Sequence, residues 1–180
     1  MRSYKTEGIV IRRRNFGEAD RLLTVFSKHH GKIQIKAVGV RKINSRRSPH
    51  IELLNYSLFN LYKGRGMPLL TEVENFENFS EIKEDLAKIG FAYHICELID
   101  GLCAENQENE EIFYLLQRTL NRLSVETDMA SVIHQFEIEL LTKLGFYTPA
   151  KFSLNFDTSL FIEEILERKL KTKQMLPRFT

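Results

Sequence analysis

Arginine and lysine are concentrated in the first third of this 180-residue chain. Residues 1–66 carry 15 Lys and Arg against 4 Asp and Glu, a net charge of +11, whereas residues 67–180 carry 11 against 20, a net charge of −9. A guanidinium can donate two parallel hydrogen bonds to one phosphate, and several fixed cations together bind a phosphate backbone without reading its sequence. The residue types and their density therefore predict a surface for a polyanion.

Twelve basic side chains could form that surface if the fold brings them to one face. They lie on several expected strands and on two loops, and positive charge alone also keeps a small domain soluble. A net charge of +11 over 66 residues nevertheless favours binding over solvation. The predicted nucleic-acid-binding residues are Arg12, Arg13, Arg14, Arg21, Lys32, Lys36, Arg41, Lys42, Arg46, Arg47, Lys63 and Arg65. The nearby aromatic residues, among them Phe16, are expected in the core rather than in stacking on bases.

Residue types that support catalysis or metal binding are sparse. His29 and His30 lie in an expected turn, with no acid or cysteine at a ligand spacing. Cys96 and Cys103 lie on one expected helix, where a rise of about 1.5 Å per residue separates them by roughly 10 Å, beyond the reach of a disulfide. The sequence therefore predicts no enzyme, no cofactor and no metal site.

The elements that position the basic residues are expected to be strands. Apolar and polar residues alternate through most of residues 4–77, with frequent turn residues, which is typical of an all-β module. In residues 31–37, Ile33, Ile35 and Ala37 share one face, and Lys32, Gln34 and Lys36 the other. Strands are predicted over 8–14, 19–27, 31–37, 52–62 and 69–76, which together indicate a small Greek-key barrel. Acidic residues of the last strand should leave one side of the barrel acidic.

After residue 79 the apolar period becomes helical. Helices are predicted from Ser80 through Cys96, from Glu108 through Leu123, from Asp128 through Leu144, and from Asp157 through Leu170. The sequence thus predicts an α+β chain, with a barrel domain over 1–79 and a helical bundle over 80–180. No signal peptide is visible and no window reaches about 18 apolar residues, so we expect a soluble cytoplasmic protein with no membrane partner.

Several segments, in order, resemble the bacterial recombination mediator RecO family. The resemblance spans residues 4 to about 147, and the ordered set is more specific than any one piece. The segments are Glu7–Ser27, His30–Lys32, Ala37–Lys42, Ser45–Arg46, Leu61–Gly66, Leu70–Glu72, Leu140–Leu141 and Leu144–Phe146.

The resemblance implies an N-terminal OB-fold barrel followed by a helical domain, in a non-enzymatic DNA repair and recombination protein of the bacterial cytoplasm and nucleoid. Members of the family bind single- and double-stranded DNA and anneal complementary strands. They work with RecR to load RecA onto strands covered by single-strand-binding protein. The twelve basic residues are then the DNA surface, and RecR is expected at the OB-fold domain.

The chain departs from the family pattern after Phe146. Many members carry a four-cysteine zinc module there, whereas this chain has no cysteine after Cys103. We therefore expect a short form without the zinc module and with a reduced helical domain. Two alternatives use the same basic face: an adaptor that docks an acidic protein partner, and an OB-fold protein that binds RNA.

Overall fold

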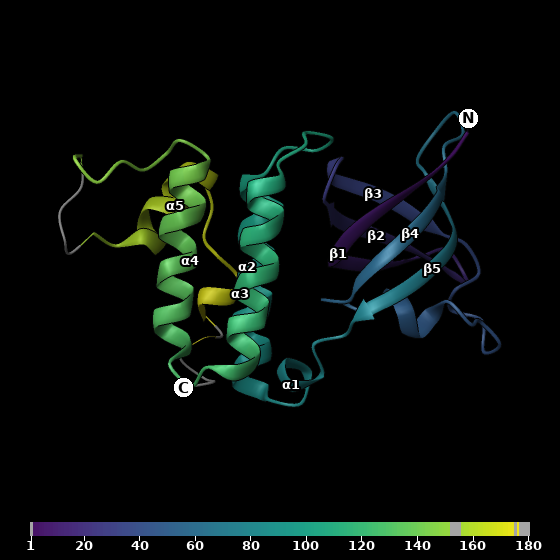
Figure 1. Ribbon diagram of the computed structural model, residues 1–180, viewed down its shortest axis with the longest axis horizontal. Coiled ribbons are helices and arrows are strands. Elements are labelled where there is room, and N and C mark those ends of the chain that lie inside the picture. The colour runs from purple at the N-terminus through teal and green to yellow at the C-terminus, as the bar shows by residue number, and fades with distance from the viewer. Residues whose placement is uncertain (1, 152–155, 175, 177–180) are drawn as a thin grey trace. The chain divides into compact units, whose positions relative to one another are not determined.

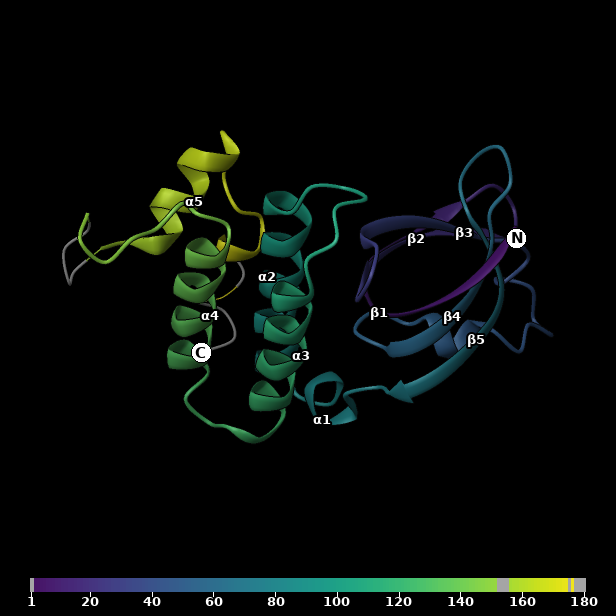
Figure 2. The ribbon, with the colours of Figure 1, turned by 45° about the horizontal axis from the view of Figure 1, so that its top comes forward.

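The alternating segments form five strands that close into a barrel, in the computed structural model that describes residues 2–151, 156–174 and 176. The strands are β1 (Ser3–Phe16), β2 (Asp20–Ser27), β3 (Gly31–Ala37), β4 (Tyr56–Tyr62) and β5 (Leu69–Glu77). Their order around the barrel is β1-β2-β3-β5-β4 (Figures 1 and 2). All neighbours are antiparallel except β3 and β5, which are parallel. The expected five-stranded OB-fold barrel is confirmed.

The barrel core follows from the period of two along each strand. Residues on one face of β2 and β3, such as Leu23, Val25, Ile33 and Ile35, pack inside the barrel with Phe59 of β4. The limits of β1 and β4 differ most from those predicted, whereas those of β2, β3 and β5 agree to within one residue. β1 is longer at both ends, and β4 begins only at Tyr56. A short 3₁₀ helix, η1 (Ser48–Ile51), and a positive φ of 72° at Leu54 interrupt the chain before it.

The segment that follows the first long helix, Cys103–Phe113, returns to the barrel, and we call it the returning segment. The Asn106 main-chain N–H donates to the Lys32 carbonyl at 2.8 Å, and Gln34 Nε2 donates to Glu105 Oε1 at 3.1 Å. Gly31, with φ of 65°, lies so close to this segment that a Cβ there would come within 1.9 Å of the Gln107 carbonyl oxygen. Sequence periodicity could not place this segment, because it forms no strand or helix over most of its length.

The helices are α1 (Ser80–Lys83), α2 (Leu86–Leu102), α3 (Glu110–Val125), α4 (Met129–Lys143) and α5 (Thr158–Leu166). The first predicted helix is wrong as one element, because Asp85 accepts the Ala87 main-chain N–H and starts a new helix there. Asp128 caps α4 as expected. α5 ends at Leu166 rather than at Leu170, because Glu167 adopts a left-handed conformation with φ of 54°.

The chain folds into two compact units, which we describe separately. The barrel unit comprises Met1–Phe79 with Cys103–Phe113, and the helical unit comprises Ser80–Leu102 with Tyr114–Thr180. We propose that these units are the two domains expected from the sequence, with the returning segment added to the first. In the described part of the chain, no helix has the length and apolar character to cross a membrane.

Cys96 and Cys103 are both buried. Burial, with a smaller contribution from the nearby Asp100 carboxylate, raises the pKa of the Cys96 thiol to about 12. A thiol with so high a pKa is a poor nucleophile and a poor metal ligand at neutral pH. Cys96 therefore acts as a small core side chain.

Candidate nucleic-acid interface

A β-bulge decides which side of the barrel wall each of three consecutive arginines occupies. Val10 pairs with Val25 of β2, but the next pair is Arg12 with Thr24, so β1 has one residue more than β2 at this point. Residues paired across strands share a side of the sheet. Arg12 and Arg14 pair with Thr24 and Leu22 and lie on the outer side.

Arg13 lies on the opposite side from its two neighbours. It pairs with Leu23, a core residue, and its Nη1 lies 2.7 Å from Glu52 Oε2. Arg21 reaches the same carboxylate, with its Nη1 3.7 Å from Glu52 Oε1. Glu52 therefore partly neutralises two of the predicted binding residues at one end of the barrel.

β3 continues the outer face that Arg12 and Arg14 begin. Lys36 pairs with Leu22, which itself pairs with Arg14, so the three strands place these side chains in one row. The Lys36 ammonium lies 5.2 Å from the centre of the Phe16 ring and 3.4 Å from Asp20 Oδ2. Phe16 is 47% exposed, contrary to the expectation of a core side chain. The face thus combines cations with an exposed aromatic ring.

The connection after β3 borders this face at the β1–β2 turn. The Gly39 main-chain N–H donates to Asp20 Oδ1 at 2.8 Å, and Arg41 Nη1 donates to the Gly17 carbonyl at 3.1 Å. The hydrogen bond from Gly39, assisted by Lys36, holds the pKa of the Asp20 carboxyl below its usual value despite some desolvation. Arg41 and the following Lys42 are exposed beside the turn.

The β4–β5 loop borders the face along β3. The Lys36 main-chain N–H donates to the Pro68 carbonyl at 2.9 Å, which ties the loop to the strand. Lys63 and Arg65 of this loop are exposed. Beside the loop lies a cleft of about 700 Å³. Its lining residues are Tyr4, His29, His30, Ile33, Gln34, Lys63, Gly66, Pro68, Asn106 and Glu108.

Three further predicted residues, besides Arg13 and Arg21, lie elsewhere or carry structural bonds. Lys32 is only 7% exposed, and its carbonyl accepts from the returning segment. Arg46 lines a second cleft, of about 440 Å³, beside Glu72 and Glu74 of β5. Arg47 donates from Nη1 to the Leu70 carbonyl at 2.8 Å and from Nη2 to the Val38 carbonyl at 2.7 Å. The twelve residues therefore do not form one continuous patch.

Comparison with known proteins assigns the chain to a family. Residues 1–79 match the family described as "Recombination protein O N terminal", and residues 83–152 match "Recombination protein O C terminal". The chain belongs to the RecO family. Two family domains in their expected order agree with the barrel and the helices that follow it.

Curated DNA repair proteins named RecO are similar to most of the chain. The RecO protein of Roseiflexus sp. (strain RS-1) is 37% identical over 145 residues, which cover 81% of this chain and 51% of the relative. That of Pelotomaculum thermopropionicum is 36% identical over 146 residues, covering 81% and 57%. That of Halalkalibacterium halodurans is 30% identical, covering 79% and 56%. The chain thus spans little more than half the length of these relatives.

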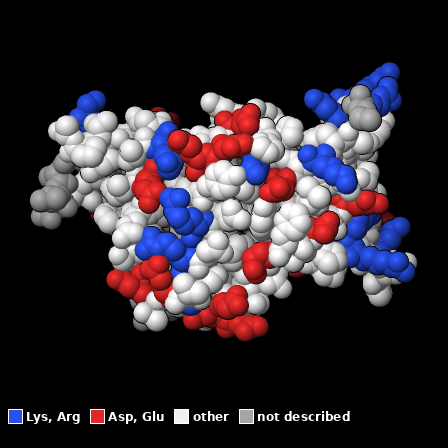
Figure 3. Space-filling model, viewed as in Figure 1, with Lys and Arg blue, Asp and Glu red and all other residues white. Residues whose placement is uncertain are grey.

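The side of the barrel formed by β5 is acidic, unlike the outer face of β1, β2 and β3. Glu72, Glu74 and Glu77 are exposed along β5. Among the strands of the barrel, Figure 3 shows acidic side chains lying between two separate groups of basic ones. Such a side repels a phosphate backbone, so the charge distribution favours the other strands and their loops as the place for a polyanion.

Proposed function

We propose that the chain acts as a RecO-type recombination mediator, which binds single- and double-stranded DNA through one face of its barrel and has no catalytic centre. The observation that carries the proposal is the outer face on which Arg12, Arg14 and Lys36 lie beside the exposed Phe16. OB-folds bind oligonucleotides on the face of strands 2 and 3, between the loops that join strands 1–2 and 4–5.

The loops at the borders of this face extend it. Arg41 and Lys42 lie at the β1–β2 turn, and Lys63 and Arg65 lie in the β4–β5 loop. A DNA strand bound along the outer face would meet cations of a loop at each end, while Phe16 offers a stacking surface to one base. Contacts with about five phosphates predict that log affinity for a single strand falls with log salt at a slope of about −3.5.

Two exposed arginines offer a matched test of the face. In the described part of the chain neither Arg14 nor Arg46 has an ion-pair partner, but Arg14 lies in the outer row and Arg46 lies beside the acidic β5. The variants Arg14→Glu and Arg46→Glu change the net charge equally. Fluorescence anisotropy of a labelled oligonucleotide at several salt concentrations should show a slope shallower by about 0.7 to 1 for Arg14→Glu alone.

The opposite ranking of the two variants, or an equal loss in both, would refute this placement of the site. Competition between DNA and RNA strands of equal length tests the RNA-binding alternative, because an RNA-binding protein would prefer the RNA strand. An affinity for DNA that does not change with salt concentration would point instead to the adaptor alternative, in which the partner is an acidic protein.

The finer activities come to this chain from the family. We infer that it anneals complementary strands and, with RecR, helps to load RecA onto DNA covered by single-strand-binding protein. Purified components test this: the chain should accelerate annealing of labelled complementary oligonucleotides, and Arg14→Glu should reduce that acceleration. Annealing no faster than in buffer would refute the inference.

A further inference from the structure

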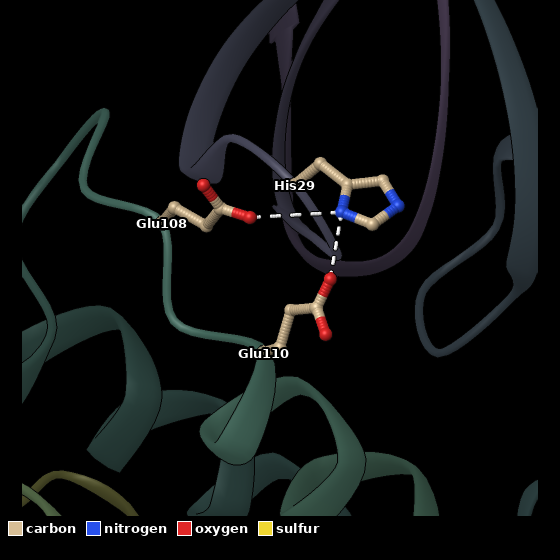
Figure 4. A group of neighbouring side chains, drawn as sticks. All are labelled: His29, Glu108 and Glu110. Atoms are coloured by element: carbon tan, nitrogen blue, oxygen red, sulfur yellow. Dashed lines mark ion pairs between the residues drawn. The ribbon is translucent and has the colours of Figure 1, made fainter.

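The fold brings together one imidazole and two carboxylates from distant parts of the sequence. His29 Nδ1, in the turn between β2 and β3, lies 2.9 Å from Glu110 Oε1 and 3.6 Å from Glu108 Oε1 (Figure 4). One ligand atom from each of the three residues lies within 4.8 Å of the other two. All three side chains are exposed, so solvent can reach the space between them.

The main chain holds the two segments in place independently of these side chains. The bond from Asn106 to Lys32 and the close approach of Gly31 to Gln107 fix the returning segment against the turn. Asn109 Oδ1 then accepts the Ile112 main-chain N–H at 3.1 Å and starts α3, which places Glu110 in its first turn. The cluster is therefore built on the barrel unit's own backbone rather than on a chance meeting of long side chains.

The spacing of the donor atoms suits a divalent transition metal. Bonds of about 2.0 to 2.2 Å at tetrahedral or octahedral angles set neighbouring ligand atoms roughly 2.8 to 3.6 Å apart. The observed distances of 2.9 and 3.6 Å from His29 Nδ1 lie within that range. One imidazole nitrogen with two carboxylate oxygens suits Zn²⁺, Co²⁺, Ni²⁺ or Mn²⁺, whereas Mg²⁺ prefers oxygen alone.

We propose that His29, Glu108 and Glu110 form a binding site for a divalent transition metal, with water completing the coordination. The charges agree: two carboxylates with a neutral imidazole match one divalent ion. Without metal, Nδ1 must carry a proton to donate to Glu110, so the ion takes the place of that proton. The bound metal would fasten the β2–β3 turn to the returning segment at the edge of the 700 Å³ cleft.

This site departs from the expectation of no metal, and the reason is distance along the chain. The two glutamates follow His29 by about 80 residues, so no local spacing could reveal them. Neither the DNA-binding row nor its loops contribute a ligand, so the proposal stands independently of the proposed function.

Isothermal titration of the full, chelator-treated chain with Zn²⁺, Co²⁺, Ni²⁺ and Mg²⁺ tests the site. One equivalent of at least one transition ion should bind, and Mg²⁺ should not compete with it. Residues that only hydrogen-bond to a metal ligand typically contribute about 10- to 100-fold to metal affinity. Since His29 and Glu110 would be ligands themselves, His29→Ala and Glu110→Gln should each weaken metal binding by at least about that factor.

His134→Asn and Glu84→Gln are the controls, since they remove an exposed histidine and an exposed acid outside the cluster. Both should bind the ion as the unaltered chain does. Circular dichroism without metal checks that every variant folds, and the metal should raise the melting temperature of the controls but not of His29→Ala. No stoichiometric binding, or equal binding by His29→Ala and His134→Asn, would overturn the proposal.

Discussion

Replacing Arg47 by alanine should destabilise the barrel rather than remove a DNA contact. Its guanidinium donates to the carbonyls of Leu70 on β5 and Val38 just after β3, at 2.8 and 2.7 Å. These two strands close the barrel through one registered pair, Lys36 with Leu69. Arg47 therefore joins the two sides of the seam where the ladder between strands is shortest.

The magnitude follows from the two hydrogen bonds. A bond from a charged donor contributes about 1.5 to 3 kcal/mol net, and two bonds from one group add incompletely. We expect Arg47→Ala to lower the free energy of unfolding by about 2 to 4 kcal/mol. With a urea slope of about 2 kcal/mol/M, the unfolding midpoint should fall by roughly 1 to 2 M.

Urea unfolding followed by circular dichroism and tyrosine fluorescence measures this, since the chain contains no tryptophan. Arg46→Ala is the matched control, because it removes the same charge from the adjacent position without a main-chain hydrogen bond. Its midpoint should stay near that of the unaltered chain. If Arg47→Ala unfolds like Arg46→Ala and instead loses DNA affinity, Arg47 belongs to the binding surface and the structural argument is refuted.

Two further predictions concern a turn and a buried acid. Gly31→Ala should destabilise the chain by more than the roughly 1 kcal/mol that a strained φ costs, because the new Cβ would meet the Gln107 carbonyl. Gly17→Ala is the control: its φ is 58° and the space around it is open, so it should show the cost of the strained φ alone. Equal decreases in melting temperature for the two variants would contradict this prediction. Burial raises the pKa of Glu97, but hydrogen bonds from Thr172, Arg168 and the main chain outweigh it and lower the pKa from 4.5 to about 2. The Glu97 carboxylate therefore stabilises the folded state fully above pH 4.5. About 2 kcal/mol of the free energy of unfolding, a figure discounted for solvent screening, should be lost as the pH falls towards 2. Acid titration of Glu97→Gln should show a smaller loss of stability over the same pH range.

The periodic parts of the fold could be predicted from the sequence because each buries a face of its own. The alternation in residues 31–37 locates β3, and Asp128 marks the start of α4. The break at Asp85 was missed, since the apolar period continues across it and only a side-chain cap interrupts the helix. The returning segment was missed for another reason: its contacts with Lys32 and Gln34 are made by main-chain atoms and polar side chains, which leave no apolar pattern.

The candidate site could be predicted in composition but not in geometry. Residue counts alone indicate a basic barrel, and they cannot show that Glu52 lies beside Arg13 and Arg21, or that Lys32 is buried. Most of the aromatic residues near the basic side chains were expected in the core, and nothing in the sequence singles out Phe16 as the exposed one. Its exposure becomes clear only once the β1–β2 turn is placed beside Lys36.

The bulge at Ile11 is the feature on which the placement of the arginines depends. Without the extra residue, the pairing of β1 with β2 would slip by one position, and each of Arg12, Arg13 and Arg14 would change sides. Arg12 and Arg14 would then point towards the barrel interior, and Arg13 would lie on the outer side. With the bulge, Arg12 and Arg14 share the outer face with Lys36, and Arg13, which points inward, has a carboxylate oxygen of Glu52 at 2.7 Å. One extra residue in β1 thus divides three consecutive cations between the proposed DNA-binding face and an ion pair with Glu52.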